Sequence, residues 1–140
     1  MGERKSWWGY VCKMIANYPT NRQRYLDSLN QSITPAYSEQ VGGHEATRTV
    51  EDIVVRAMSK TQFNEWLAVD AAISVTALDE GKDSPTLKMI QIVFWERDSK
   101  GRYRKYRYHR AGEATGYSYR TVVRKVSNFI KLVGENFGFD

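Results

Sequence analysis

Apolar residues recur at helical spacing along most of this chain. Over residues 6–18 they follow an i, i+3, i+4, i+7 pattern, which is typical of an amphipathic helix. Its apolar members are Trp7, Trp8, Tyr10, Val11, Met14, Ile15 and Tyr18. Pro19 predicts the end of this helix, because proline disfavours helical geometry in the residue before it. Thr20 and Gln23 have the spacing of a capping box, so a second helix is predicted to begin there.

The middle of the chain alternates between polar stretches and further helical patterns. Residues 34–48 hold one proline and two glycines with few large apolar groups, so they are predicted to form a loop. Helical spacing resumes near Thr49 and again over about Thr61–Asp79. The second of these helices is predicted to turn inward Phe63, Trp66, Leu67, Ile73 and Ala77. Ser84 followed by Pro85 predicts another helix start, since serine caps helices well and proline fits the first helical position.

The last part of the chain is predicted to be a polar loop followed by two helices. Residues 96–104 are polar and contain a glycine, so we expect a loop or a short hairpin there. Helical segments are predicted over roughly 105–114 and 118–136. Because strand signals are weak, the predicted fold class is all-α. We expect a helical body over residues 1–98 and a distinct C-terminal part over residues 99–140.

The last two helices have the spacing of a helix-turn-helix motif. Gly116 lies at their junction, where a turn with positive φ requires glycine because a Cβ would clash. Gly112, four residues earlier, is small enough to let the two helices approach closely. Val122, six residues after the turn glycine, is expected to pack back onto the first helix. Ser118 is expected to cap the second helix.

The second helix of this motif has one apolar face and one basic face, taking about 100° per residue. The predicted apolar face consists of Val122, Val126, Phe129, Ile130 and Val133. The opposite face carries Arg120, Arg124, Ser127 and Lys131, with Lys125 to one side. Arginine suits the major groove of DNA because its planar fork bonds two acceptors on guanine at once. A serine hydroxyl and free N–H groups at the helix start suit phosphate.

Charge is distributed unevenly along the 140 residues. Residues 1–99 hold 11 lysines and arginines against 13 acids, a net charge of −2, whereas residues 100–140 hold 10 against 3, a net charge of +7. Such a concentrated positive block most often faces a polyanion, so it favours a nucleic acid as partner. The basic run that would widen the contact along the DNA backbone is Lys100, Arg102, Arg104, Lys105, Arg107 and Arg110.

Tyrosines are interleaved with the basic residues of this run, in the sequence RYRKYRYHR. Aromatic and basic alternation also suits single-stranded nucleic acid, because bases stack on aromatic rings. We favour the alternative in which Tyr103, Tyr106 and Tyr108 pack inward beneath their basic neighbours, since a helix-turn-helix motif requires such packing.

Residue types that carry catalysis or bind metal are scarce. With one cysteine, Cys12, and two histidines, His44 and His109, the usual four-ligand structural zinc site cannot be assembled. Neither histidine lies in a recognisable nucleophile motif, and no glycine-rich phosphate-binding pattern is present. We therefore expect no metal, no cofactor and no enzymatic activity. Cys12 is expected to be a buried thiol, and Asp70, which falls on an apolar stripe, is expected to have a partner or to lie at an exposed edge.

The sequence predicts neither an export signal nor a membrane span. The charged start MGERKSWW is not followed by the apolar core of a signal peptide. The most apolar window, Leu67 to Leu78, is too short to cross a bilayer and contains Asp70. We expect a soluble, cytoplasmic protein without contact to a membrane.

The order of these segments resembles the RinA family of phage late-gene transcription activators, which neighbour the ArpU-like regulators. The segment WWGYVCKMIANYPTNRQRYLDSLNQSI is similar to the opening part of that family, and RTVEDIVVRAMSKTQFNEWLAVDAAISVTAL is similar to its helical linker. The C-terminal GEATGYSYRTVVRKVSNFIKLVGENFGF is the most similar part, and it also resembles region four of bacterial sigma factors. The insert SKGRYRKYRYHR departs from sigma-type domains in being longer and more basic.

This resemblance, which covers most of the chain, implies a DNA-binding transcriptional regulator encoded by a phage or prophage. It implies double-stranded DNA and the host RNA polymerase as partners, in the cytoplasm of a bacterial cell. It places at the DNA Ser118, Tyr119, Arg120, Arg124 and Lys125. Two other functions stay open at this point, a DNA-packaging protein like a small terminase subunit and a non-catalytic interaction module.

The oligomeric state is left open by the sequence. The aromatic cluster of Trp7, Trp8 and Tyr10 is expected to belong to the core. The alternative is a homodimer surface, in which case two basic ends would face two half-sites on DNA.

Overall fold

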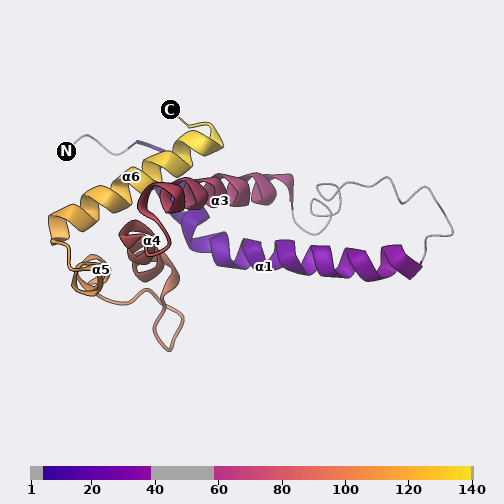
Figure 1. Ribbon diagram of the computed structural model, residues 1–140, viewed down its shortest axis with the longest axis horizontal. Helices are drawn as coiled ribbons and strands as arrows, with labels where there is room; N and C mark the ends of the chain where they lie inside the picture. Colours follow the sequence, from indigo (N-terminus) through magenta and orange to yellow (C-terminus); the bar gives the residue numbers. More distant parts are fainter. Residues whose placement is uncertain (1–4, 39–58, 140) are drawn as a thin grey trace.

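The described residues form an all-α fold, as predicted. The computed structural model describes residues 5–38 and 59–139, and every regular element within them is helical. In chain order these elements are α1 (Trp8–Ser38), α3 (Lys60–Glu80), α4 (Pro85–Ile90), the π-helical segment η3 (Gln91–Trp95), α5 (Arg107–Thr115) and α6 (Tyr119–Phe137). Helices α1, α3 and α6 pack against one another, and α4 and α5 close one end of the molecule (Figure 1). The helix predicted from Thr49, most of the loop predicted over 34–48, and His44 lie outside the described residues.

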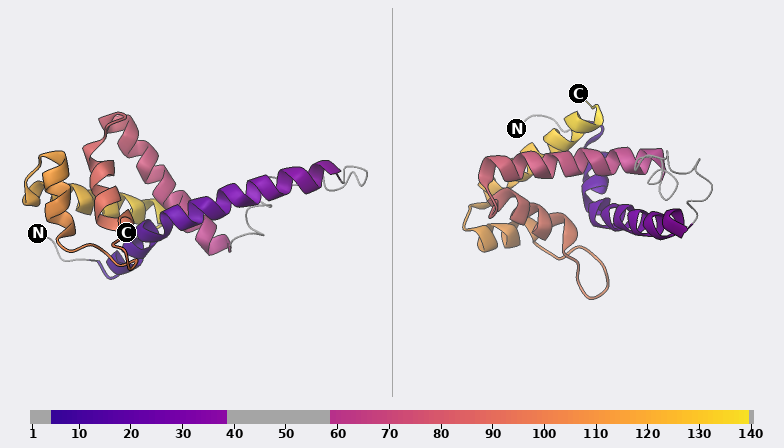
Figure 2. Two further views of the ribbon diagram at one scale, coloured as in Figure 1. Left: turned by 90° about the horizontal axis from the view of Figure 1, so that it is seen from below. Right: turned by 45° about the vertical axis from the view of Figure 1, so that its right-hand side comes forward.

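The first helix is longer than predicted. The sequence predicts a helix that stops at Pro19 and a second that starts near Thr20, but α1 is one helix of 31 residues. It also includes residues 34–38, which the sequence assigns to a loop. Both predictions were wrong for these residues. The helix bends in its first half, as proline within a helix requires (Figures 1 and 2).

A hydrogen bond from a distant residue lets α1 continue through Pro19. Proline has no N–H, so the carbonyl of Ile15, four residues earlier, lacks its helical donor. The indole N–H of Trp95, at the end of η3, donates to that carbonyl at 2.8 Å. The ring of Tyr18 lies beside it, with its centroid 5.7 Å from that of Trp95. A tertiary contact thus replaces the missing backbone bond.

Helix α4 begins at its predicted cap, and α3 begins one residue before its predicted start, at a cap that the sequence analysis leaves unassigned. The Ser59 hydroxyl accepts the N–H of Gln62 at 3.0 Å, and the Gln62 side chain accepts the N–H of Ser59 at 3.2 Å, which completes a capping box. Ser84 caps α4, with Pro85 at the first helical position. One inward assignment was wrong, because Leu67 is 42% exposed. It lies one residue, about 100°, around the helix from the buried Trp66.

Buried residues from both parts of the chain form one core. The apolar face predicted for α6 is buried throughout, from Val122 to Val133. Trp7 stacks on Phe139 with 5.4 Å between ring centroids and covers Gly134 of α6, where a Cβ would lie 2.6 Å from the Trp7 ring. The N-terminal segment therefore packs on the last helix, and residues 1–98 and 99–140 share their core.

The burial and the partners of several residues in the N-terminal part can be compared with their predictions. Trp7 and Trp8 are half-buried against the core, as expected, whereas Tyr10 is exposed. Cys12 is half-buried, so its thiol is less enclosed than predicted. Asp70 has a partner, as predicted, since the hydroxyl of Tyr18 donates to its Oδ1 at 2.7 Å.

Candidate nucleic-acid interface

The loop before α5 is a short hairpin held by one aspartate. Arg97 and Tyr103 form an isolated antiparallel bridge, and the N–H of Asp98 donates to the carbonyl of Arg102 at 2.8 Å. The carboxylate of Asp98 accepts the N–H groups of Lys100 and Arg102 at 2.8 and 3.0 Å. The prediction of a loop or short hairpin over 96–104 is confirmed. The loop leaves Lys100, Arg102, Arg104 and Lys105 exposed.

The junction of α5 and α6 has the geometry that its glycines predict. Gly116 has φ +81°, and its N–H donates to the carbonyl of Gly112 at 2.8 Å. A Cβ at Gly112 would lie 2.7 Å from the carbonyl oxygen of Tyr117 and 3.6 Å from Val122. Because this contact leaves no room for a side chain, Gly112 sets how closely α6 approaches α5. The turn places the first residues of α6 beside the first turn of α5 (Figure 1).

Helix α6 presents its basic residues to solvent along one face. Arg120, Arg124 and Lys131 are exposed, and Ser127 between them is half-buried. Within residues 5–38 and 59–139, no ion pair or hydrogen bond holds these three basic groups. Their charges are therefore available to an external anion.

The N-terminus of α6 carries Ser118 and Tyr119. The Ser118 hydroxyl accepts the N–H of Thr121 at 3.2 Å and thus caps the helix as predicted. Tyr119 is 51% exposed, and its ring stacks on that of His109 of α5 with 4.5 Å between centroids and 20° between planes. Arg120 follows Ser118 and Tyr119 in the sequence. The start of α6 therefore combines a capped helix end, an exposed aromatic ring and a guanidinium group with no partner among the described residues.

Two of the residues predicted to contact DNA, Arg107 and Arg110, have partners within the fold. The guanidinium of Arg107 donates to the carbonyl of Val93 at 2.9 Å and lies 4.1 Å from the ring centroid of Tyr103. It therefore satisfies a carbonyl at the end of η3, which no helical N–H reaches. Arg110 lies 3.7 Å from Glu96, in a partly exposed ion pair. The structure thus separates both residues from the free face of α6.

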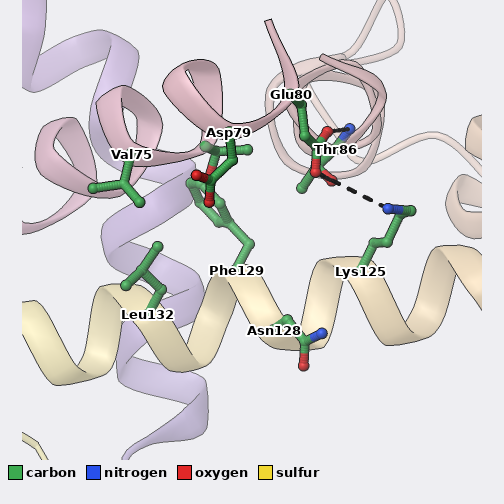
Figure 3. A pocket seen from close by; sticks show the side chains of 9 residues that line it. Val75, Asp79, Glu80, Thr86, Lys125, Asn128, Phe129 and Leu132 are labelled. Atoms are coloured by element: carbon green, nitrogen blue, oxygen red, sulfur yellow. Dashed lines mark hydrogen bonds and ion pairs between the residues drawn. The ribbon is translucent and has the colours of Figure 1, made fainter.

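Lys125 also has an intramolecular partner. Its Nζ lies 4.0 Å from Oε2 of Glu80, across a hollow between α3 and α6 (Figure 3). Glu80 further accepts hydrogen bonds from the hydroxyls of Ser84 and Thr86 at 2.8 and 2.7 Å. Partial burial by itself raises the pKa of the Glu80 carboxyl, but the hydrogen bonds from Thr86 and Ser84 and the Lys125 charge outweigh it, so the pKa is lowered. The Glu80 carboxylate thus contacts both α6, through Lys125, and the start of α4, through Ser84 and Thr86.

The tyrosines of the basic run do not all pack inward. Tyr108 is half-buried against the core, as predicted. Tyr103 is 43% exposed, so the prediction of inward packing was wrong for it, and the guanidinium groups of Arg97 and Arg107 lie 3.9 and 4.1 Å from its ring centroid. Tyr106 is 75% exposed, so the prediction of inward packing was wrong for this residue. Its backbone is left-handed, with φ +57°, which turns the chain into α5 and aims the ring away from the core.

A shallow hollow lies between α5, the turn that follows it and the start of α6. It is lined by His109, Gly112, Glu113, Gly116, Tyr117 and Tyr119. His109, Glu113 and Tyr117 are not predicted as site residues by any sequence motif, although the alternation of tyrosine and arginine points to this region. Their convergence depends on the turn at Gly116, which brings two segments of the chain together.

The described residues hold no metal-binding cluster and no membrane-spanning helix. Among the described residues, no cluster of three or more histidine, cysteine or acidic side chains is arranged to hold a metal ion. In the same residues, no helix is long and apolar enough to cross a bilayer. Comparisons with family models, with curated proteins and with solved structures find no match to this chain. Its function is therefore inferred from its own residues.

Proposed function

We propose that this chain binds double-stranded DNA through the exposed face of α6 and acts as a sequence-specific transcriptional regulator. The observation that carries this proposal is the set of free basic groups on α6, Arg120, Arg124 and Lys131, next to a tight two-helix turn. An α-helix fits the major groove, where guanidinium groups read guanine and backbone phosphates attract positive charge.

The roles of the residues follow from their positions along α6. Arg120 and Arg124 lie one turn apart near the start of the helix, which is the part that enters the groove in two-helix DNA readers. Lys131 lies almost two turns further on and would contact the phosphate backbone. The exposed loop residues Lys100, Arg102, Arg104 and Lys105 would add contacts to the same backbone.

The particular kind of regulator is proposed from the order of the segments. The resemblance to RinA-like activators makes a phage or prophage late-gene activator our specific proposal, with the host RNA polymerase as second partner. A homodimer on two half-sites is compatible with this role.

Selection from random duplex DNA tests the sequence specificity. We expect the full chain to enrich one sequence, and Arg124→Ala to weaken binding to it about tenfold more than binding to random duplex. Lys13→Ala is the matched control, because Lys13 is also a basic residue exposed on a helix but lies on α1. It should leave both affinities within about twofold.

Two results would contradict the proposal. If Arg124→Ala lowers both affinities equally, then Arg124 contacts phosphate and reads no base. If the chain binds no duplex at low salt, the basic face serves a protein partner instead.

A further inference from the structure

Tyr106 and His109, at the start of α5, have no role in the proposed duplex contact, and their rings adjoin that of Tyr119 at the start of α6. Tyr106, His109 and Tyr119 form one exposed series of rings, in which Tyr106 meets His109 edge-on at 6.4 Å between centroids and His109 stacks on Tyr119. Large exposed rings cost free energy in water, since their apolar area stays hydrated. Such a cluster on a monomer's surface marks a place where something binds.

The hollow beside these rings is an open depression that is lined in part by aromatic side chains. It lies between the rings of His109, Tyr117 and Tyr119. Beside Gly116 the space is open, because a Cβ built there would meet no other heavy atom within 4 Å. A flat ring can therefore enter next to the backbone and stack on the ring of Tyr119 or His109.

The charges around the hollow favour a nucleotide as the occupant. Lys105 and Arg120 flank the ring series in the chain and are exposed, so they would attract a phosphate backbone. Glu113 is the single acid among residues 100–125 and lines the hollow itself. A carboxylate repels phosphate but accepts hydrogen bonds from the amino group of a base. The basic side chains around the hollow would bind the phosphate of a nucleotide, and Glu113 in its lining would accept a hydrogen bond from the base. This arrangement matches a nucleotide whose base enters the hollow while its phosphate stays outside.

We propose that this hollow takes up one unpaired base, so that the chain binds DNA with an unpaired stretch more tightly than the same DNA when fully paired. The inference rests on the proposed DNA-binding function and extends it from paired duplex to locally opened duplex. A paired base is stacked on both sides and cannot reach the ring of Tyr119, whereas an unpaired base exchanges solvent for an aromatic partner.

The test compares two labelled DNAs of identical length, a fully paired duplex and the same duplex with four central mismatched positions. Affinities are measured by fluorescence anisotropy for the full chain. We expect about tenfold tighter binding to the mismatched DNA, the factor that one stacked base contributes. A 2-aminopurine placed in the unpaired stretch should lose fluorescence on binding, because stacking on an aromatic ring quenches it.

Substitution of single aromatic rings tests whether they cause the preference for mismatched DNA. Tyr119→Leu and His109→Leu should each bring the ratio of the two affinities close to one and remove most of the quenching. Tyr10→Leu is the matched control, because Tyr10 is exposed to a similar degree but lies on α1 against Phe137 and Phe139. It should keep both the ratio and the quenching.

The outcomes separate this inference from the proposed function. Equal affinity of the wild-type chain for the two DNAs, with paired duplex still bound, overturns the base-binding hollow and leaves duplex binding intact. A preference that survives in both ring variants also overturns it, since the preference would then come from the flexibility of the DNA. Absence of binding to either DNA contradicts the proposed function itself.

Discussion

At the scale of single residues, the basic block divides into two sets with different tasks. Arg107, Arg110 and Lys125 each have a partner within the fold. Arg120 and Arg124 have none among the described residues and extend into solvent. The net charge of this region therefore overstates what is available to DNA. We expect substitutions in the first set to lower stability and substitutions in the second to lower DNA affinity.

Gly112 makes the sharpest prediction at this scale. Gly112→Ala places a Cβ 2.7 Å from the backbone oxygen of Tyr117, and a backbone atom cannot move aside without shifting the turn. We expect a loss of about 1–3 kcal/mol in the free energy of unfolding, the usual cost of overpacking, measured by urea denaturation. DNA affinity should fall as well, because the turn positions α6.

The control is another glycine in a helix. Gly9 in α1 has nothing within 4 Å of a built Cβ, so Gly9→Ala should be neutral or stabilise by about 0.5–1 kcal/mol. If both variants unfold at the same urea concentration, the close approach at Gly112 is not what fixes the turn.

At the scale of elements, α1 shows how a tertiary contact overrides a local signal. Pro19 is a strong helix breaker by itself, and the sequence around it also offers a new capping box. The helix continues because Trp95 donates to the carbonyl of Ile15 across 80 positions of sequence. Beyond this bend, α1 crosses α3 and packs against it (Figure 2).

A double-mutant cycle tests this account of α1. Trp95→Phe keeps a ring but removes the indole donor, so the carbonyl of Ile15 loses its partner, and we expect about 1–3 kcal/mol of destabilisation. In that background, Pro19→Ala restores a backbone N–H to the same carbonyl. It should therefore recover more stability than it adds to the wild type, and urea denaturation of the four proteins gives the coupling. Zero coupling would show that Trp95 and Pro19 act independently.

The contact between α1 and α3 predicts a dependence on alkaline pH. Burial, the hydrogen bond to Asp70 and the charge of that carboxylate raise the pKa of Tyr18, and Arg22 offsets this in part. Because the folded state has the higher pKa, this stabilisation is complete below the ordinary tyrosine pKa of about 10 and declines as the pH rises above it. Tyr18→Phe should flatten the fall in unfolding free energy between about pH 9 and 11. An unchanged slope would contradict the link.

Elements with local caps were predictable from the sequence, and those that depend on distant contacts were not. Ser59, Ser84 and Ser118 each bond an N–H three residues on, so α3, α4 and α6 begin within one residue of their predicted starts. The glycine turn and the buried face of α6 follow from spacing in the same way. The course of α1 depends on Trp95, and the exposure of Tyr106 depends on a left-handed backbone that no local pattern marks.

The candidate site was predictable in part for the same reason. The free face of α6 follows from helical periodicity alone. The intramolecular partners of Arg107, Arg110 and Lys125 lie on η3, on Glu96 just after it, and on α3, so no local pattern reveals them. The hollow lined by His109 and Tyr119 likewise forms between two helices and appears once the turn is built.

At the scale of the whole molecule, the near-neutral and the strongly basic parts of the chain share one hydrophobic core. Helix α6 packs against α3 and α1 with its apolar face and presents its basic face outward. The helix proposed to read DNA is thus also a central element of the fold, anchored by Trp7 on Gly134 and by Lys125 near Glu80. We expect this rigid mounting to hold the basic face in one orientation, which base-specific contacts require.

The salt dependence of duplex binding tests the central claim most directly. Neutralising Arg120, Arg124 and Lys131 with glutamine removes three charges from the proposed interface. Glutamine at Lys13, Lys60 and Lys82 removes three exposed charges elsewhere and leaves the same net charge. We predict that the first variant lowers affinity strongly and reduces the slope of log affinity against log salt by about 0.9, the value for the one phosphate contact assigned to Lys131, while the second keeps the wild-type slope. Equal slopes for the two variants would show that duplex DNA does not bind at the face of α6.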